Sequence, residues 1–325
     1  MALKIIYAIL TVVVGIGAAV ALYWLLNKLV EMLPGPAEGR IKPYIYILPA
    51  YLAITFYLIY PAILTVIDAF KDSTSTNWIG FANFSKLLGS HDFQQTLLNT
   101  LLWILIVPAV SVVVGLGVAT LADKLSPSGE SLAKTIIFVP MAISFVGAGT
   151  VWKYVYAYSP NGDQIGLLNG IATKLGHSPV AWLSLSHFHL NSLLLMVMLL
   201  WAQVGYSMVL LSSAIKGVPE ETLEAASIDG ASSVQTFFRV VVPQINGTIV
   251  TVFVTVLISV MKIFDIVFVM TNGSFNTNVV GTEFFNQLFT FFDYGTASAI
   301  VVLLMLAVVP VMFYQVRHFK REEAV

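Results

Sequence analysis

The chain has 325 residues, of which 58% are hydrophobic and only 10% are Asp, Glu, Lys or Arg, whereas soluble globular proteins carry roughly 25% charged residues. Together with a mean hydropathy of +0.87, this scarcity of charge excludes a water-soluble body and predicts an all-α polytopic membrane protein. The formal net charge of −1 leaves no basic surface for nucleic acid, and the absence of cysteine excludes disulfides and thiolate metal sites.

Seven stretches are apolar and long enough to cross a bilayer of ~30 Å as helices, which takes about 20 residues each. In chain order they lie at 5–26, 45–67, 97–122, 134–157, 191–213, 245–270 and 294–316. In the fourth stretch, Pro140, Gly147 and Gly149 favour a kinked or interrupted helix. In the sixth, Lys262 and Asp265 lie three residues apart, so we expect them to share one helix face.

The orientation follows from the Lys and Arg residues of the connections, because cytoplasmic loops are enriched in them. Four fall in 1–4, 70–95, 158–190 and 271–293, and ten fall in 27–44, 123–134, 214–244 and 317–325. The second set is therefore predicted to be cytoplasmic, with the N-terminus outside and the C-terminus inside.

The first stretch could instead be a signal peptide, because Lys4 precedes an apolar run and Ala19-Val20-Ala21 resembles a cleavage site. Cleavage would leave the basic residues of 27–44 outside the membrane, so an uncleaved helix is favoured. We expect residues 1–44 to form an extra N-terminal helix with a cytoplasmic linker, beside a core of six helices. We expect residues 317–325 to form a cytoplasmic tail.

Common catalytic and nucleotide-binding motifs are absent from the sequence: it contains no GxxxxGK[ST], HExxH or GxSxG. It also offers no metal-binding constellation, because His187 and His189 have no carboxylate close in sequence. We therefore expect no catalytic residue and no metal ligand, and a chain that is not an enzyme by itself.

The connection 216–245 reads as two short helices joined at a turn. Pro219 suits a helix start, Glu220 and Glu221 suit the positive end of the helix dipole, and Gly230 can end the helix in a left-handed conformation. A helix resting on anionic lipid would be basic, whereas this one carries Glu224 and Asp229. The segment therefore predicts a helix that docks into a groove of a partner protein.

This connection resembles the EAA loop of the membrane subunits of binding-protein-dependent carbohydrate ABC importers, of the maltose and glycerol-phosphate permease type. The residues that carry the match are Glu224, Ala225, Ala226, Asp229, Gly230, Ala231, Phe238 and Pro243. The resemblance extends over about 45–316, and includes Gly166-Leu167-Leu168-Asn169, Trp182-Leu183 and Phe264-Asp265. One departure follows Thr271, where family members often have Gly-Gly-Pro and this chain has Asn272-Gly273-Ser274-Phe275.

The resemblance implies a six-helix type I ABC importer permease core at 45–316, in the inner membrane of a bacterium or archaeon. It implies that Glu224, Ala225, Ala226, Asp229, Gly230, Ala231 and Pro243 couple the chain to an ATPase. The implied partners are a second homologous permease, two P-loop ATPase subunits that bind ATP and Mg²⁺, an extracytoplasmic solute-binding protein, membrane lipid and a carbohydrate. This chain would bind no cofactor itself, and its substrate would be an oligosaccharide, an α-glucoside or a glucosyl osmolyte.

Polar and aromatic residues within the spans are candidates for a sugar path, because hydroxyls need hydrogen-bond partners and sugar C–H faces stack on aromatic rings. They are Asn99, Trp152, Tyr154, Gln203, Tyr206, Lys262, Phe264 and Asp265. Charges at such depth usually face a cavity or a partner, but Lys262 and Asp265 could equally form a neutral pair that joins two helices. Packing is the alternative for each of the others.

Two other functions remain as alternatives. An ion-gradient-driven secondary transporter would usually show internal repeats and mid-depth carboxylates, and only Asp265 is a deep acid here. A membrane enzyme such as a glycosyltransferase would need clustered acids outside the membrane, and these are scattered except in the EAA loop.

Overall fold

The structure is a computed structural model that describes residues 2–32 and 35–322, and it confirms the all-α fold class. The described residues include five helices that are long and apolar enough to cross a membrane, or up to seven if each of two bent helix pairs is one span. The chain divides into two compact units, Met1–Ile67 and Asp68–Val325.

The first unit is built from α1 (Ala2–Glu31), α2 (Gly35–Ile54), a π-helical turn (Thr55–Ile59) and α3 (Tyr60–Asp68). α1 and α2 contact each other through polar aromatic residues. The rings of Tyr23 and Tyr46 stack with their centroids 6.1 Å apart, and the Tyr46 hydroxyl donates to Asn27 Oδ1 at 2.6 Å. The first two predicted spans, 5–26 and 45–67, lie within helices of this unit.

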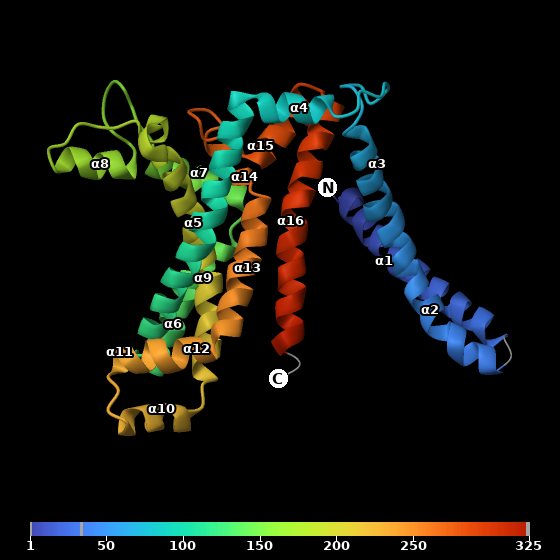
Figure 1. Cartoon of the computed structure of the whole chain (residues 1–325), viewed down its shortest axis with the longest axis horizontal. Coiled ribbons are helices and arrows are strands. Elements are labelled where there is room, and N and C mark those ends of the chain that lie inside the picture. The colour runs from blue at the N-terminus through green and yellow to red at the C-terminus, as the bar shows by residue number, and fades with distance from the viewer. Residues whose placement is uncertain (1, 33–34, 323–325) are drawn as a thin grey trace. The chain divides into compact units, whose positions relative to one another are not determined.

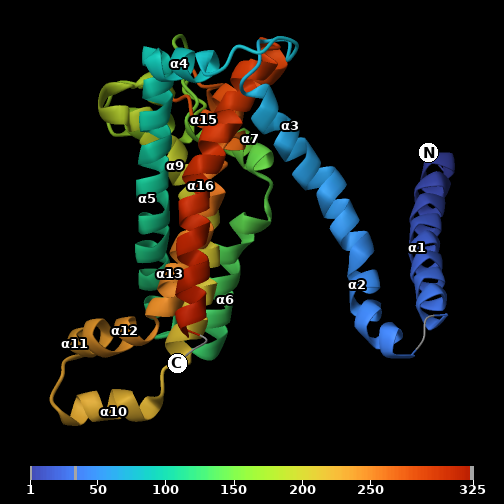
Figure 2. The same ribbon diagram turned by 45° about the vertical axis from the view of Figure 1, so that its right-hand side comes forward.

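The second unit is a bundle of long helices. α5 (His91–Ala122) packs on α9 (Leu190–Lys216) and on α13 (Asn246–Met261), and α16 (Tyr294–Glu322) packs on α13 (Figures 1 and 2). The core between them contains fully buried Trp103, Leu195 and Met208.

The two ends of this bundle carry different elements. α4 (Ala82–Gly89) and α15 (Val280–Phe285), which a π-helical turn (Asn286–Thr290) follows, lie at one end, here named the α4 end. α10 (Glu220–Ile228) lies at the other, the α10 end, with a second helix made of α11 (Ser233–Thr236), a π-helical turn (Phe237–Val241) and α12 (Val242–Gln244).

Glycines allow α5, α6 (Pro127–Phe138) and α9 to approach closely, as small residues do in membrane bundles. A Cβ added at Gly115 would lie 2.6 Å from the Cβ of Ser207, and one added at Gly205 would lie 2.8 Å from the Cα of Phe138. Both glycines therefore sit where no larger side chain fits without a shift of the helices.

The fourth predicted span is interrupted, as its Pro and Gly residues predicted. A 3-10 turn at Val139–Ala142 follows α6, and α7 (Phe145–Val155) then starts at an angle of 104°. The Ser144 hydroxyl caps α7 by accepting from the N–H of Gly147 at 3.1 Å.

The prediction that one continuous helix covers 245–270, with Lys262 and Asp265 on one face, is wrong. α13 ends at Met261, Lys262 and Phe264 have non-helical backbone angles, and α14 (Asp265–Met270) is a separate helix. The cause is packing from further along the chain. Gly281 lies against the Ile263 carbonyl, and the Phe264 ring lies 4.7 Å from the ring of Phe285.

Candidate functional site

The loop at the α10 end has the two helices that the sequence predicted. α10 begins after Pro219, and Gly230 follows it with a left-handed φ of +78°, which glycine adopts without the cost that a Cβ brings. The second helix starts with a capping box, in which Ser232 and Gln235 each satisfy the other's backbone N–H. Two short helices with a sharp turn between them therefore project from the bundle.

Most of the α10 surface is not covered by the described residues of this chain. Within that part α10 packs on the second helix of its own loop, and Gln244 Nε2 donates to Thr222 Oγ1 at 3.3 Å. Glu224 is exposed, and Ile228 is 86% exposed. A narrow helix with an acidic face and an uncovered isoleucine at its tip is suited to docking into a groove on another protein.

The structure brings most of the EAA residues together on the loop. Ala225, Asp229, Gly230 and Pro243 are exposed, whereas Ala226 and Ala231 are half-buried against the second helix. Between the two helices is a hollow of about 390 Å³, lined by Ala226, Asp229, Gly230, Ala231, Gln235, Arg239 and Val240.

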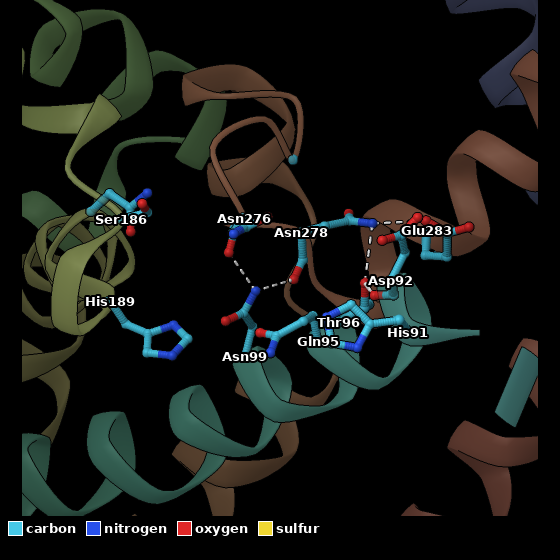
Figure 3. Close-up of a pocket in the computed structure, with 12 residues that line it drawn as sticks. His91, Asp92, Gln95, Thr96, Asn99, Ser186, His189, Asn276, Asn278 and Glu283 are labelled. Atoms are coloured by element: carbon cyan, nitrogen blue, oxygen red, sulfur yellow. Dashed lines mark hydrogen bonds between the residues drawn. The ribbon is translucent and has the colours of Figure 1, made fainter. Parts of the chain in front are cut away.

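A polar pocket of about 540 Å³ lies at the α4 end (Figure 3). Three segments far apart in sequence form it: the first turns of α5, the residues around the start of α9, and the stretch that runs from the loop after α14 into α15. Its lining residues are His91, Asp92, Gln95, Thr96, Asn99, Ser186, His189, Asn191, Gly273, Asn276, Asn278 and Glu283.

The wall of this pocket depends on Asn99. Asn99 is 1% exposed, and its Nδ2 donates to the carbonyls of Asn276 at 2.7 Å and Asn278 at 2.9 Å. Asn191 Nδ2 likewise donates to the Phe275 carbonyl at 2.7 Å. These bonds fix a loop whose residues Asn272, Gly273, Phe275 and Asn276 all have positive φ. The segment that departs from the family pattern is therefore held by side chains of α5 and α9.

The chemistry of the pocket is that of amides, hydroxyls and imidazoles with two carboxylates. Asp92 and Glu283 supply negative charge, and no lining residue that the structure describes is Lys or Arg. Glu283 already accepts hydrogen bonds from Asn278 and Gln287. Such a surface favours a neutral ligand with many hydroxyl donors over an anion.

Of the eight predicted path residues, Asn99 lines this pocket and the others lie elsewhere. Trp152 packs on Trp201, with ring centroids 5.9 Å apart, and lines a separate apolar cavity of about 440 Å³ with it. Tyr154 is 65% exposed. Gln203 and Tyr206 are half-buried on α9. Lys262 is exposed at the break after α13, and Phe264 and Asp265 are half-buried around the start of α14.

Several pocket residues were missed by the sequence reading. His91 and Gln95 lie just before the stretch 97–122, and Glu283 lies in the middle of the connection 271–293; the hydropathy pattern treats all three positions as connections. His189 was considered only as a metal ligand. A search for polar residues within two turns of the outer helix ends would have found His91, Gln95 and His189, but not Glu283.

Comparison with known proteins gives a consistent result. Residues 111–323 match the family profile described as binding-protein-dependent transport system inner membrane component. The chain is 42% identical to the alpha-glucoside transport system permease protein AglF of Rhizobium meliloti (strain 1021), covering 98% of both chains. It is 44% identical to the osmoprotective compounds uptake permease protein GgtC of Synechocystis sp., covering 86% of this chain and 99% of the relative.

Among solved structures, a bacterial ABC transporter involved in the import of the acidic polysaccharide alginate contains a chain with the same fold. The TM-score is 0.75 at 22% identity, covering 87% of this chain and 98% of that one. The chain belongs to the family of binding-protein-dependent transport system inner membrane components.

Proposed function

We propose that this member of the binding-protein-dependent inner membrane components is the permease subunit of an ATP-driven importer for a neutral carbohydrate, either an α-glucoside or a glucosyl osmolyte. The observation that carries the substrate class is the 42% identity, over 98% of both chains, to a permease named for alpha-glucoside transport. The relative at 44% identity is named for osmoprotective compounds, which accords with a small neutral solute.

The polar pocket at the α4 end supports the same substrate class. Its lining combines hydroxyl, amide and imidazole groups with two carboxylates. A sugar offers several hydroxyl donors and no negative charge, so it suits these acceptors, whereas an anionic sugar would be repelled by Asp92 and Glu283. In this proposal the pocket is where the substrate first contacts the permease, and Asn99 holds its wall.

The α10 loop is the contact with the energy source. A cytoplasmic ATPase subunit receives α10 in a groove, with Glu224 at the contact and Ile228 covered. ATP and Mg²⁺ bind to two such ATPase subunits, and this chain contributes no catalytic residue. A second permease of similar fold carries the other coupling loop, and an extracytoplasmic binding protein delivers the sugar to the α4 end. The N-terminus is then outside and the C-terminus in the cytoplasm.

In this arrangement the substrate path lies between the two permeases. ATP binding draws the ATPase subunits together and moves α10 with them, which switches the path from inward-facing to outward-facing. Hydrolysis returns it. The carboxylate of Glu224 is exposed on α10, so a charge reversal there acts on the interface and not on the folding of this chain.

The test is the variant Glu224→Lys in the assembled transporter, with Asp163→Lys as a matched charge reversal in the loop between α7 and α8. ATP-driven uptake of labelled maltose, sucrose and glucosylglycerol into proteoliposomes is compared at equal amounts of inserted chain. Glu224→Lys should lower uptake by about ten-fold or more, since like-charge contacts across an interface cost several kcal/mol, and Asp163→Lys should not. Normal uptake by Glu224→Lys would refute the coupling role, and uptake driven by an ion gradient without ATP would favour a secondary transporter.

A further inference from the structure

Four charged side chains meet where α9 runs into the loop that carries α10. Asp123 follows α5, Glu130 and Lys134 lie one turn apart on α6, and Lys216 is the last residue of α9. These four residues are named the stem ring. Lys134 Nζ lies 3.3 Å from Asp123 Oδ1 and contacts Glu130, while Lys216 Nζ contacts Glu130 and lies 3.9 Å from Asp123 Oδ1. Each ammonium thus contacts both carboxylates, and the ring is neutral.

Ser212 joins the stem ring to the body of α9. Its hydroxyl donates to Asp123 Oδ1 at 3.0 Å and also contacts Lys134 Nζ. Because Ser212 lies one turn before Lys216, both present the same face of α9 to the ring. The ring and Ser212 therefore tie together the end of α5, the start of α6 and the end of α9.

Three of the four stem-ring side chains are covered enough for their charges to act strongly on each other, whereas that of Lys216 is 53% exposed. The side chains of Asp123, Glu130 and Lys134 are 19%, 16% and 21% exposed, respectively. Screening by salt is weak for partly buried pairs. Removing one ammonium leaves two carboxylates to share a single cation, which disfavours the present arrangement more than the loss of an exposed ion pair would.

The position of the stem ring matters because α10 has few other connections. Only Gly217, Val218 and Pro219 separate Lys216 from the start of α10. Within the described chain α10 packs on its own loop, so a force on α10 reaches the bundle through two stems, Lys216 on one side and Gln244 on the other. The ring sits on the first of these stems.

We propose that Lys134 is a positioning residue of the transport cycle. It contacts both carboxylates of the stem ring and Ser212, and so makes the α5–α6 turn move together with the end of α9 when α10 is displaced. Without it, Lys216 and Ser212 still join α9 to the two carboxylates, but Asp123 and Glu130 share one half-exposed cation, so the tie between α9 and the α5–α6 turn weakens. This inference rests on the proposed function, because it assigns to Lys134 the transmission of a movement that an ATPase subunit imposes on α10.

The experiment measures ATP hydrolysed per sugar imported by the complete transporter in proteoliposomes, using labelled maltose, sucrose and glucosylglycerol as probes. Lys134→Gln should raise this ratio by roughly five-fold or more, the lower bound for typical coupling between two sites, while the yield of assembled transporter stays as in the wild type. Lys134→Arg, which keeps the charge and the hydrogen bonds, should restore the wild-type ratio. Lys124→Gln removes the same charge from an exposed position in the same turn and should leave the ratio unchanged.

A purely structural role makes a different prediction: uptake and ATP hydrolysis would then fall together, and an unchanged ratio in Lys134→Gln overturns the proposal. If that variant fails to assemble, the double variant Lys134→Gln, Glu130→Gln leaves a neutral pair of Asp123 and Lys216, and the same criterion applies to it. Failure of the wild type to import any probe in an ATP-dependent manner would instead count against the proposed function itself.

Discussion

Replacing Asn169 by alanine should loosen the segment that α8 (Leu167–Lys174) holds together at the α4 end. Asn169 is fully buried, and its side chain makes four hydrogen bonds. Its Nδ2 donates to the carbonyls of Ala157 and Val180, both at 2.9 Å. Its Oδ1 accepts from the N–H of Val180 at 2.8 Å and from Trp182 Nε1 at 3.1 Å.

The size of the effect follows from these bonds. At a net value of about 1 kcal/mol each, the four bonds contribute about 4 kcal/mol to keeping the segment closed. Since each 1.4 kcal/mol is a factor of ten, the open population of this segment should rise by roughly three orders of magnitude. Local opening of this kind governs proteolysis when reclosing is faster than cleavage.

The assay is limited trypsin digestion of the purified chain in mild detergent, following cleavage after Lys174, the exposed last residue of α8. Asn161→Ala is the matched control, because its side chain is exposed and its backbone carbonyl, which accepts from Ser159 Oγ, is retained. Asn169→Asp keeps the two acceptor bonds but places a carboxylate oxygen against the carbonyls of Ala157 and Val180, so it should also open the segment. A cleavage rate in Asn169→Ala within about three-fold of the wild type, less than 1 kcal/mol, would refute the reasoning.

Two further predictions concern the turn after α10 and the ion pair of Lys86 on α4 with Asp293, the residue before α16. Gly230→Ala should strain the turn by about 1–2 kcal/mol, because φ is +78° there, and ATP-driven uptake should fall. Gly170→Ala is the control and should leave uptake unchanged, because a Cβ added there meets nothing within 4 Å. Burial raises the pKa of Asp293, but hydrogen bonds from Thr296 and from Lys86 at 3.0 Å outweigh it, so the pKa lies below the ordinary value of 3.8. The stability that this carboxylate contributes is present above pH 3.8 and is lost as the pH falls through its lower folded value. Melting temperatures between pH 7 and pH 3 should therefore drop more steeply in the wild type than in Asp293→Asn.

The sequence was informative wherever a local pattern determines the structure. The apolar stretch 97–122 lies within α5, and the helix continues to His91 through polar residues that hydropathy assigns to a connection. Gly230 ends α10 as predicted, because a left-handed residue after a helix is a local requirement that glycine meets. Pro140 marked the interruption before α7, because a proline has no backbone N–H to continue a helix, whereas Gly147 and Gly149 lie within α7.

The break at Lys262 had no such local signal. Residues 261–265 contain neither Pro nor Gly, and the helix ends there because Gly281 and Phe285 pack against Ile263 and Phe264. The pocket at the α4 end was equally hidden, since Asn99 acts on carbonyls 177 and 179 residues further along the chain. Contacts at such separations depend on the folded bundle and leave no periodic trace in a single sequence.

The stem ring and the polar pocket share a helix, and this gives the proposed transport cycle a physical route. α9 carries Lys216 at the ring and Asn191 at the pocket, about 38 Å apart along the axis at 1.5 Å per residue. Gly115 lies against Ser207 and Gly205 lies against Phe138, so no layer of side chains separates α5, α6 and α9 at these contacts. Because packed interiors transmit strain, we expect these three helices to move as one block.

Two interruptions adjoin this block, the turn between α6 and α7 and the break between α13 and α14. A displacement of α10 should therefore move α5, α6 and α9 together and be absorbed at those interruptions. The loop at 272–278 follows α14 directly and is bonded to Asn99 on α5 and Asn191 on α9. A movement of the block therefore acts on this loop through Asn99 and Asn191, so we expect a movement that starts at the ATPase to alter the hold on a sugar first at the wall of the pocket.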